Sequence, residues 1–226
     1  MTALRVIRWA LKAALAFVLV TVAWVALYRF VPPPFTFTML GDVVHGQGVT
    51  KTWMPLDRID PDMPRAAIAG EDARFCVHNG FDWKGIASAA ASNAEGRRIR
   101  GGSTISQQTA KNAFLFQGGG YVRKAFEAYF TVLIEAIWGK RRIMEVYLNL
   151  AETGIGTYGV EAGAERYFNH SATTLSPTEA ARIAAVLPLP KKRAAVDPHG
   201  FVRRHGNRLA RYVGTVRRAG LDSCLR

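Results

Sequence analysis

The stretch RKAFEAYFTVLIEAIW, residues 123–138, decides the fold, because it reads as one long helix with almost no polar face. A surface helix keeps one charged side, whereas a helix that is apolar on several sides must be buried. The stretch KRRIMEVYLNLAE, residues 140–152, follows at once and also places apolar residues at helical spacing. Two such helices in succession predict a domain in which helices pack around one core.

Helical patterns continue on both sides of this pair. Pro64 suits the first turn of a helix in PRAAIAGEDARF, and WKGIASAAASNAE carries small apolar residues at helical spacing. Ser176 before Pro177 predicts a capped helix start, and FVRRHGNRLARYVGTVRRAG reads as a basic last helix. We expect residues 35–63 to be irregular with one short strand. Because no repeat and no convincing β-alternation occurs, we predict one mainly α-helical domain.

The N-terminus carries an apolar run, residues 11–31, that is long enough to cross a membrane. A helix needs roughly 20 residues to span a hydrocarbon layer of about 30 Å. More basic residues precede the run than follow it, which predicts an N-terminus inside and the remainder outside. A cleaved signal peptide and a buried core helix are the alternatives, although YRFVPPP lacks a small-residue cleavage site. The flanking cations are Arg5, Arg8, Lys12 and Arg29.

The predicted organisation is therefore an anchor followed by one domain. Residues 1–34 would comprise the cytoplasmic end, the transmembrane helix and a stiff stalk of three prolines, and residues 35–226 the exported domain. Cys76 and Cys224 would meet an oxidising compartment and could pair. Two thiols in separate regions are a weak signal, so the sequence favours leaving them unpaired.

The charge of the chain restricts its partners. Its 226 residues hold 30 Lys and Arg against 17 Asp and Glu, a formal charge of +13, and 49% are hydrophobic. That apolar fraction excludes a disordered basic tail. Four of the positive charges flank the predicted span, which leaves +9 for the exported part. Export argues against nucleic acid and favours lipid headgroups or a phosphate-bearing substrate.

Several common catalytic machineries are missing from the sequence. There is no GxxxxGK[ST] loop, no HExxH, no G-x-S-x-G elbow and no Ser-x-x-Lys. The five histidines are scattered, and no cysteine pair has the spacing of a zinc site. Asp60-Pro61-Asp62 resembles the D-x-D of metal-dependent sugar-nucleotide transferases, but it is interpreted as a turn. No set of residues identifies a metal.

Three short segments stand out as candidates for chemistry. EDARFCVHNGFDW, residues 71–83, places an acidic pair at the end of a helical stretch. GGSTISQQTAKN, residues 101–112, combines a glycine pair with a helix start, where exposed N–H groups favour an anion. RKAFE, residues 123–127, places two cations and a carboxylate on one helix face. Taken singly, each segment also has a structural interpretation without chemistry: a solvated helix end, a Gly–Ser helix start and a surface ion-pair cluster, respectively.

In this order and spacing the three segments resemble the motifs of the peptidoglycan glycosyltransferases, lysozyme-like enzymes that polymerise lipid II. The matching patterns are EDxxFxxHxGxD, GGSTIxQQxxKN and RKxxE, and residues 141–168 and 175–190 fit two further motifs. The resemblance covers roughly residues 50–190. With its short anchor and no transpeptidase module, the chain looks like the monofunctional biosynthetic type, which implies a lysozyme-like domain at the outer face of an inner membrane.

The resemblance also implies roles for individual residues. Glu71 would be the general base that activates an acceptor hydroxyl, and Glu127 would orient cations or stabilise developing positive charge. The partners implied are lipid II, the growing glycan chain on undecaprenyl pyrophosphate, the membrane and the cell-wall synthesis machinery. A divalent cation, Mg²⁺ or Mn²⁺, could assist at the pyrophosphate. Expected pyrophosphate-binding residues are Ser103, Thr104, Gln107, Lys111, Asn112, Arg123 and Lys124, and expected motif-shaping residues are Asp72, Phe75 and His78.

Two departures from the family pattern put loop details in doubt. The loop before Arg123 reads QGGGY, where relatives often carry a cation, and residues 153–156 lack the usual aromatic and proline. Two rival functions remain: a lysozyme-like hydrolase of the same polymer, and a non-enzymatic envelope scaffold that binds anionic lipid. A hydrolase would need a protonated acid in an apolar pocket instead of a basic phosphate cradle, and a scaffold would need neither Glu71 nor Glu127.

Overall fold

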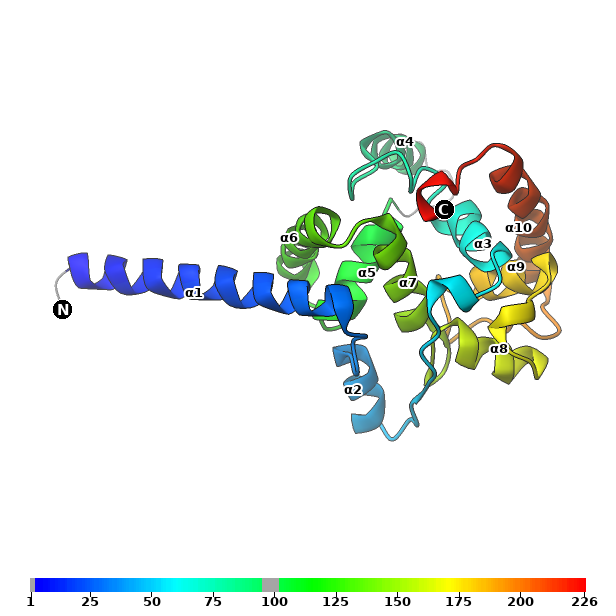
Figure 1. The fold of residues 1–226 in the computed structure, drawn as a ribbon, viewed down its shortest axis with the longest axis horizontal. Coiled ribbons are helices and arrows are strands. Elements are labelled where there is room, and N and C mark those ends of the chain that lie inside the picture. Colours follow the sequence, from blue (N-terminus) through cyan, green and yellow to red (C-terminus); the bar gives the residue numbers. More distant parts are fainter. Residues whose placement is uncertain (1–2, 95–101) are drawn as a thin grey trace.

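The computed structural model describes residues 3–94 and 102–226, and it is mainly helical, as predicted. A long N-terminal helix, α1, projects as a rod from a domain formed by the other elements (Figure 1). Gly101, of the predicted glycine pair, and Glu95 lie outside the described residues. The α-helices are α1 Ala3–Phe30, α2 Phe37–Val44, α3 Asp62–Glu71, α4 Trp83–Ala94, α5 Ile105–Phe114, α6 Gly120–Ile137, α7 Lys140–Leu150, α8 Val160–Phe168, α9 Pro177–Val186 and α10 Gly200–Arg218.

The core forms where α5 packs on α6 and α7, and where α9 packs on α3 and α10. Small residues permit the close packing of α3 and α9, since Ala66, Ala67 and Ala181 are fully buried. On the other side, the rings of Phe114 in α5 and Phe130 in α6 stack with centroids 4.6 Å apart. The predicted apolar helix is thus α6. It begins at Gly120, three residues before the predicted stretch.

A small sheet was not expected from the pattern of the sequence. Strand β1 (Thr50–Lys51) pairs in parallel with β3 (Thr157–Tyr158), and β2 (Glu152–Gly154) pairs with β3 in antiparallel register. Strands of two or three residues are too short to show alternation. The backbone at residue 156 approaches Gly48 so closely that only glycine fits. Gly156 has φ +65°, and a Cβ there would come within 2.0 Å of the Gly48 carbonyl oxygen. The short strand expected within residues 35–63 is β1.

The expectation that residues 35–63 are irregular is corrected at two places. Residues 37–44 are helical, because the Thr36 side chain caps α2 by accepting a hydrogen bond from the Met39 N–H. Helix α3 begins at Asp62, so Pro64 lies in its first turn, as predicted, and the helix starts two residues earlier than expected. The predicted cap at Ser176 is confirmed, since its side chain and that of Glu179 form a capping box with Pro177 in the first turn.

Within the described part of the chain, α1 is the single helix long and apolar enough to cross a membrane. Its last turns pack on the domain instead of standing clear of it. Val25 is fully buried and its carbonyl accepts a hydrogen bond from the Trp138 indole, and the Thr21 hydroxyl lies 2.7 Å from the Tyr129 hydroxyl. The end of the predicted span therefore lies against α6, and the division at residue 34 stays a prediction.

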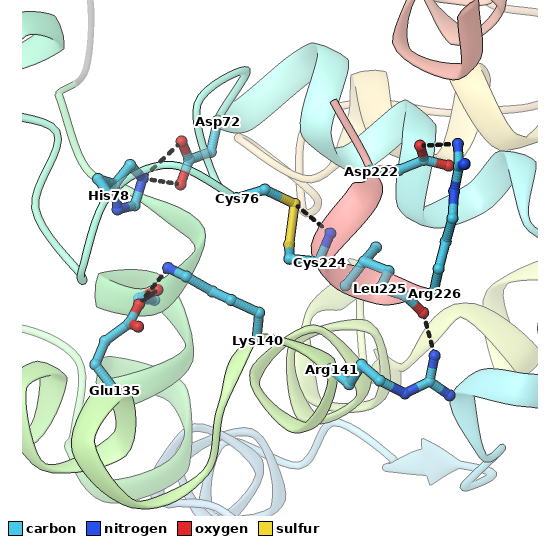
Figure 2. The surroundings of a disulfide bond; sticks show 11 residues. Asp72, Cys76, His78, Glu135, Lys140, Arg141, Asp222, Cys224, Leu225 and Arg226 are labelled. Carbon is cyan, nitrogen blue, oxygen red and sulfur yellow. Dashed lines mark hydrogen bonds and ion pairs between the residues drawn. A yellow bond between two sulfur atoms is a disulfide. The ribbon is translucent and has the colours of Figure 1, made fainter. Parts of the chain in front are cut away.

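Cys76 and Cys224 form a disulfide, with Cα atoms 5.3 Å apart (Figure 2). The preference for unpaired thiols was wrong, because the fold brings together residues that are 148 positions apart. The bond ties the C-terminal 3₁₀ turn, Ser223–Leu225, to the loop after α3. Arg141 holds the same turn by donating to the Leu225 carbonyl. The C-terminus is thereby fixed beside the first candidate motif.

Candidate active site

Glu71 is the last residue of α3, and its side chain is partly buried. Its Oε2 accepts a hydrogen bond of 2.8 Å from the Gln108 amide in α5. Burial raises the pKa of Glu71, and the neighbouring Asp72 adds to that increase, while Gln108, Arg193 and Lys111 oppose it. A carboxylate with a raised pKa accepts a proton more readily, which suits a general base working near neutral pH.

Asp72 connects the first motif to the start of α5. Both of its carboxylate oxygens lie 3.0 Å from His78 Nε2, and Oδ2 also accepts a hydrogen bond from the Ile105 N–H (Figure 2). Phe75 is fully buried, and the Lys140 ammonium lies 4.6 Å from the centre of its ring. These contacts are all within the protein, which supports the shaping role predicted for these residues.

Thr104 and Gln107 cap α5. The Thr104 hydroxyl donates to the Gly80 carbonyl and accepts from the Gln107 N–H, and Gln107 Oε1 accepts from the Thr104 N–H. The only side-chain proton of Thr104 is therefore used, whereas a phosphate oxygen requires a donor. In this structure Thr104 and Gln107 act as caps, and their assignment to pyrophosphate stays a prediction. Gln108, the next residue along α5 from Gln107, is the glutamine that reaches Glu71.

The third motif forms an ion-pair cluster on α6. The Glu127 side chain is buried, and its two oxygens bind Arg123 Nη1, at 2.6 Å, and Lys124 Nζ. Lys124 also donates to the hydroxyl of the exposed Ser103, which joins the second and third motifs. Arg123 donates to the Gly118 carbonyl at 2.6 Å. The glycine loop that lacks the family's cation thus positions a cation through its backbone.

Lys111 connects the two carboxylates electrostatically. It lies one turn beyond Gln107 on α5, and burial lowers its pKa, with Arg123 and Lys124 acting in the same direction and Glu127 opposing them. Lys111 in turn lowers the pKa of Glu71. A partly desolvated ammonium gains more from an approaching anion than an exposed one, because the local dielectric constant is lower.

A cleft of about 380 Å³ opens beside these groups. Gln108, Lys111 and Asn112 line it from α5, and the segment 187–192 after α9 forms part of its wall. Glu71 and Glu127 are not lining residues, but their partners Gln108 and Lys111 are. The structure thus brings the second motif into the cleft and connects it to Glu71 through the Gln108 hydrogen bond and to Glu127 through the charge of Lys111.

Sequence reasoning missed a second charged group in this cleft. Lys191 Nζ binds Asp42 and lies 3.6 Å from Glu152 Oε1, and the Tyr158 hydroxyl donates to Asp42 at 2.6 Å. Burial, with the Asp42 charge, raises the pKa of Glu152 to about 7 against the effect of Lys191. The sequence did contain a signal for Glu152, because a carboxylate directly after an apolar helix is a candidate for a partly buried charge. Asp42 and Lys191 are 149 positions apart, and no sequence pattern connects them.

Residues 3–94 and 102–226 contain no group of three His, Cys, Asp or Glu side chains able to hold a metal ion. Glu127 uses both oxygens for Arg123 and Lys124, and Glu71 uses one for Gln108. The Glu127 carboxylate is thus committed to its two cations, whereas Glu71 keeps the oxygen that does not bind Gln108. The divalent cation stays a prediction.

Comparison with known proteins adds independent evidence. Residues 38–213 match the model of a family described as transglycosylase. The chain is 52% identical to a biosynthetic peptidoglycan transglycosylase of Caulobacter vibrioides over 95% of each chain. It is 46% identical to that of Rhodospirillum centenum, over 96% of this chain and 93% of the relative, and 47% identical to that of Bdellovibrio bacteriovorus, over 90% and 85%.

The match to these relatives runs through nearly the whole of each protein, so those relatives leave no room for a transpeptidase-sized second module. It also includes the segments that carry Glu71, Lys111 and Glu127. The family model covers well over half of the chain, and the relatives are similar throughout. The chain therefore belongs to the transglycosylase family.

Proposed function

We propose that this chain is a peptidoglycan glycosyltransferase that polymerises lipid II into glycan strands. It would transfer the MurNAc end of a chain on undecaprenyl pyrophosphate to the GlcNAc 4-hydroxyl of lipid II, with inversion from α to β. The observation that carries the proposal is the position of Lys111 in one cleft, coupled to Glu71 on one side and to the Glu127 cluster on the other.

Glu71 serves as the general base. The nucleophile is a neutral alcohol, so its proton must be accepted as the new bond forms. The raised pKa of Glu71 makes it a stronger base than an exposed glutamate, and the hydrogen bond from Gln108 fixes the orientation of its carboxylate. The oxygen that does not bind Gln108 is the one that takes the proton.

The cations serve the leaving group. Pyrophosphate departs as an anion and needs charge neutralisation more than a proton. Lys111, Arg123 and Lys124 provide three positive charges, and Glu127 holds two of them in place through short ion pairs. Ser103, bonded to Lys124, lies at the edge of the same cluster. Asn112 lines the cleft and offers a further donor.

The N-terminal helix suits substrates that are held in a membrane. With α1 as an anchor and its N-terminus inside, the domain lies at the outer face, where polyprenyl-linked substrates are found. Helix α6, which carries the Glu127 cluster, packs on α1 (Figure 1). Enzyme and substrates then meet by diffusion in two dimensions.

A hydrolase of the same polymer is the second candidate, because the raised pKa of Glu71 also suits a general acid. The cation cluster argues against it, since a glycosidase leaving group is an alcohol that needs a proton donor. The product separates the two: a polymerase yields longer glycan from lipid II, and a hydrolase yields soluble fragments from glycan.

The test is lipid II polymerisation by the purified full-length protein, with glycan products resolved on a gel, with and without EDTA. We expect Glu71→Gln to fold normally and to make no polymer. Glu165→Gln, an exposed glutamate on α8, is the matched control and should retain the wild-type rate. Near-wild-type turnover by Glu71→Gln would refute the assignment of the base, and glycan cleavage without polymerisation would refute the function.

A further inference from the structure

Helix α10 carries a row of exposed arginines on one face. Arg204, Arg208, Arg211 and Arg218 recur at intervals of four, three and seven residues, which align along an α-helix. The opposite face, with Val213 at its centre, is buried against α9 and α3. At 1.5 Å per residue the row extends for roughly 21 Å.

The charge of this row is not compensated by the protein. Helix α10 contains no acidic residue, and in the part of the chain that the structure describes these four arginines form no ion pair with a carboxylate. Arg208 donates to His205 Nδ1, and Arg218 lies near the Thr215 hydroxyl. Like charges three or four residues apart destabilise a helix. Glutamates at some of these positions would stabilise helix α10. Because arginines stand there instead, the helix surface favours a binding partner that supplies the negative charge.

The middle of the row contains a shallow hollow of about 270 Å³. Arg208, Arg211, Tyr212 and Thr215 line it. Its polar groups are two guanidinium groups and two hydroxyls, with no carboxylate among them. A guanidinium offers paired N–H donors that match the two oxygens of a carboxylate. The hollow is therefore suited to an anionic group that presents two oxygens to these donors, and the end or side chain of an acidic peptide is one such group.

The location of α10 argues against a lipid surface. The helix lies at the end of the molecule opposite to the projecting α1 (Figure 1). The potential of charged headgroups decays with a Debye length of about 8 Å at physiological salt, so a membrane crossed by α1 would not reach this face. The segment 187–192, which walls the cleft, leads along the chain to α10 and carries the exposed Lys192.

We propose that the arginine row of α10 binds the carboxylates of the peptides carried by the glycan strand after it leaves the cleft. The proposal rests on the proposed function, which supplies a product with acidic peptides at regular intervals. A strand held at several carboxylates would stay on the enzyme between additions. Because the proposed ligand is an acidic peptide, its binding to the arginine row should weaken steeply as the salt concentration rises.

The experiment measures co-sedimentation of full-length, detergent-solubilised protein with isolated peptidoglycan sacculi. The variant R208Q/R211Q removes two charges from the hollow, and R58Q/K84Q removes two exposed charges from other elements as a matched control. We expect at least tenfold weaker binding for R208Q/R211Q and little change for R58Q/K84Q. Amidation of the sacculus carboxylates should weaken wild-type binding to the same extent. Cooperative thermal unfolding of both variants shows that they are folded.

Equal binding by the two variants, unchanged binding to amidated sacculi, or no binding by the wild type would overturn the proposal. Loss of binding to phosphatidylglycerol vesicles by R208Q/R211Q, with sacculus binding unchanged, would identify a lipid surface and also overturn it. The same preparations are assayed for lipid II polymerisation, where R208Q/R211Q should keep the wild-type initial rate. A wild type that binds sacculi but does not polymerise lipid II refutes the proposed function instead.

Discussion

The disulfide between Cys76 and Cys224 allows a quantitative prediction. It joins residues 148 positions apart and so restricts the unfolded chain. The chain-entropy relation gives a stabilisation of about 5 kcal/mol for a loop of this length. Removal of native disulfides typically costs 2–5 kcal/mol. We therefore expect C76S/C224S, or reduction of the wild type, to lower the free energy of unfolding by about 2–5 kcal/mol.

Loss of the disulfide should also affect the active site. Cys76 lies between Asp72 and His78, whose side chains bond to each other, and Asp72 accepts the N–H of Ile105 at the start of α5. Freed from the C-terminal turn, this loop has fewer restraints on the geometry around Glu71. We expect faster amide hydrogen exchange in residues 72–80 and a lower rate of polymerisation under conditions where the protein is still folded.

The assay is thermal unfolding of the full-length protein in detergent, with and without reductant. At roughly 2–4 °C per kcal/mol for a protein of this size, the midpoint should fall by about 4–20 °C. C76S/C224S is the control, because its midpoint should match the reduced wild type and should not respond to reductant. Equal midpoints for oxidised and reduced wild type would refute the reasoning.

Three further predictions concern the active site and its cleft. Glu127→Gln should fold but lose at least about a hundredfold in polymerisation rate, because a neutral amide no longer holds Arg123 and Lys124; a few-fold effect would reduce Glu127 to scaffold. Thr104→Ala should lose about 1 kcal/mol of stability in chemical unfolding, because α5 loses its capping side chain, and the KM for lipid II should not change. A higher KM at unchanged stability would instead support a role in binding pyrophosphate. The pKa of Glu152, raised from 4.5 to about 7, means that the folded state binds this proton more tightly than the unfolded state. The contribution of protonated Glu152 to the free energy of unfolding is complete below about pH 4.5 and is lost as pH rises through 7. The total loss is up to about 3 kcal/mol. The stability of Glu152→Gln should therefore fall less than that of wild type between these pH values, and parallel curves would contradict the shift.

Helix α5 carries side chains that serve different purposes in the fold. The motif predicts α5 as a site element, because its residue types and spacing lie within one short segment. Which of its side chains reach other segments depends on how α5 packs in the fold. In that packing Gln108 donates a hydrogen bond to Glu71, and Gln107 lies within the capping box.

The sequence by itself determined the helical class, the apolar anchor and the residue types of the site, because helical periodicity and short motifs are local patterns. Tertiary structure alone decided the disulfide, the Asp42–Lys191–Glu152 group and the position of helix α10 relative to α1. These features join segments that are far apart in the chain. Their geometry follows from how all the helices pack, and no window of sequence contains it.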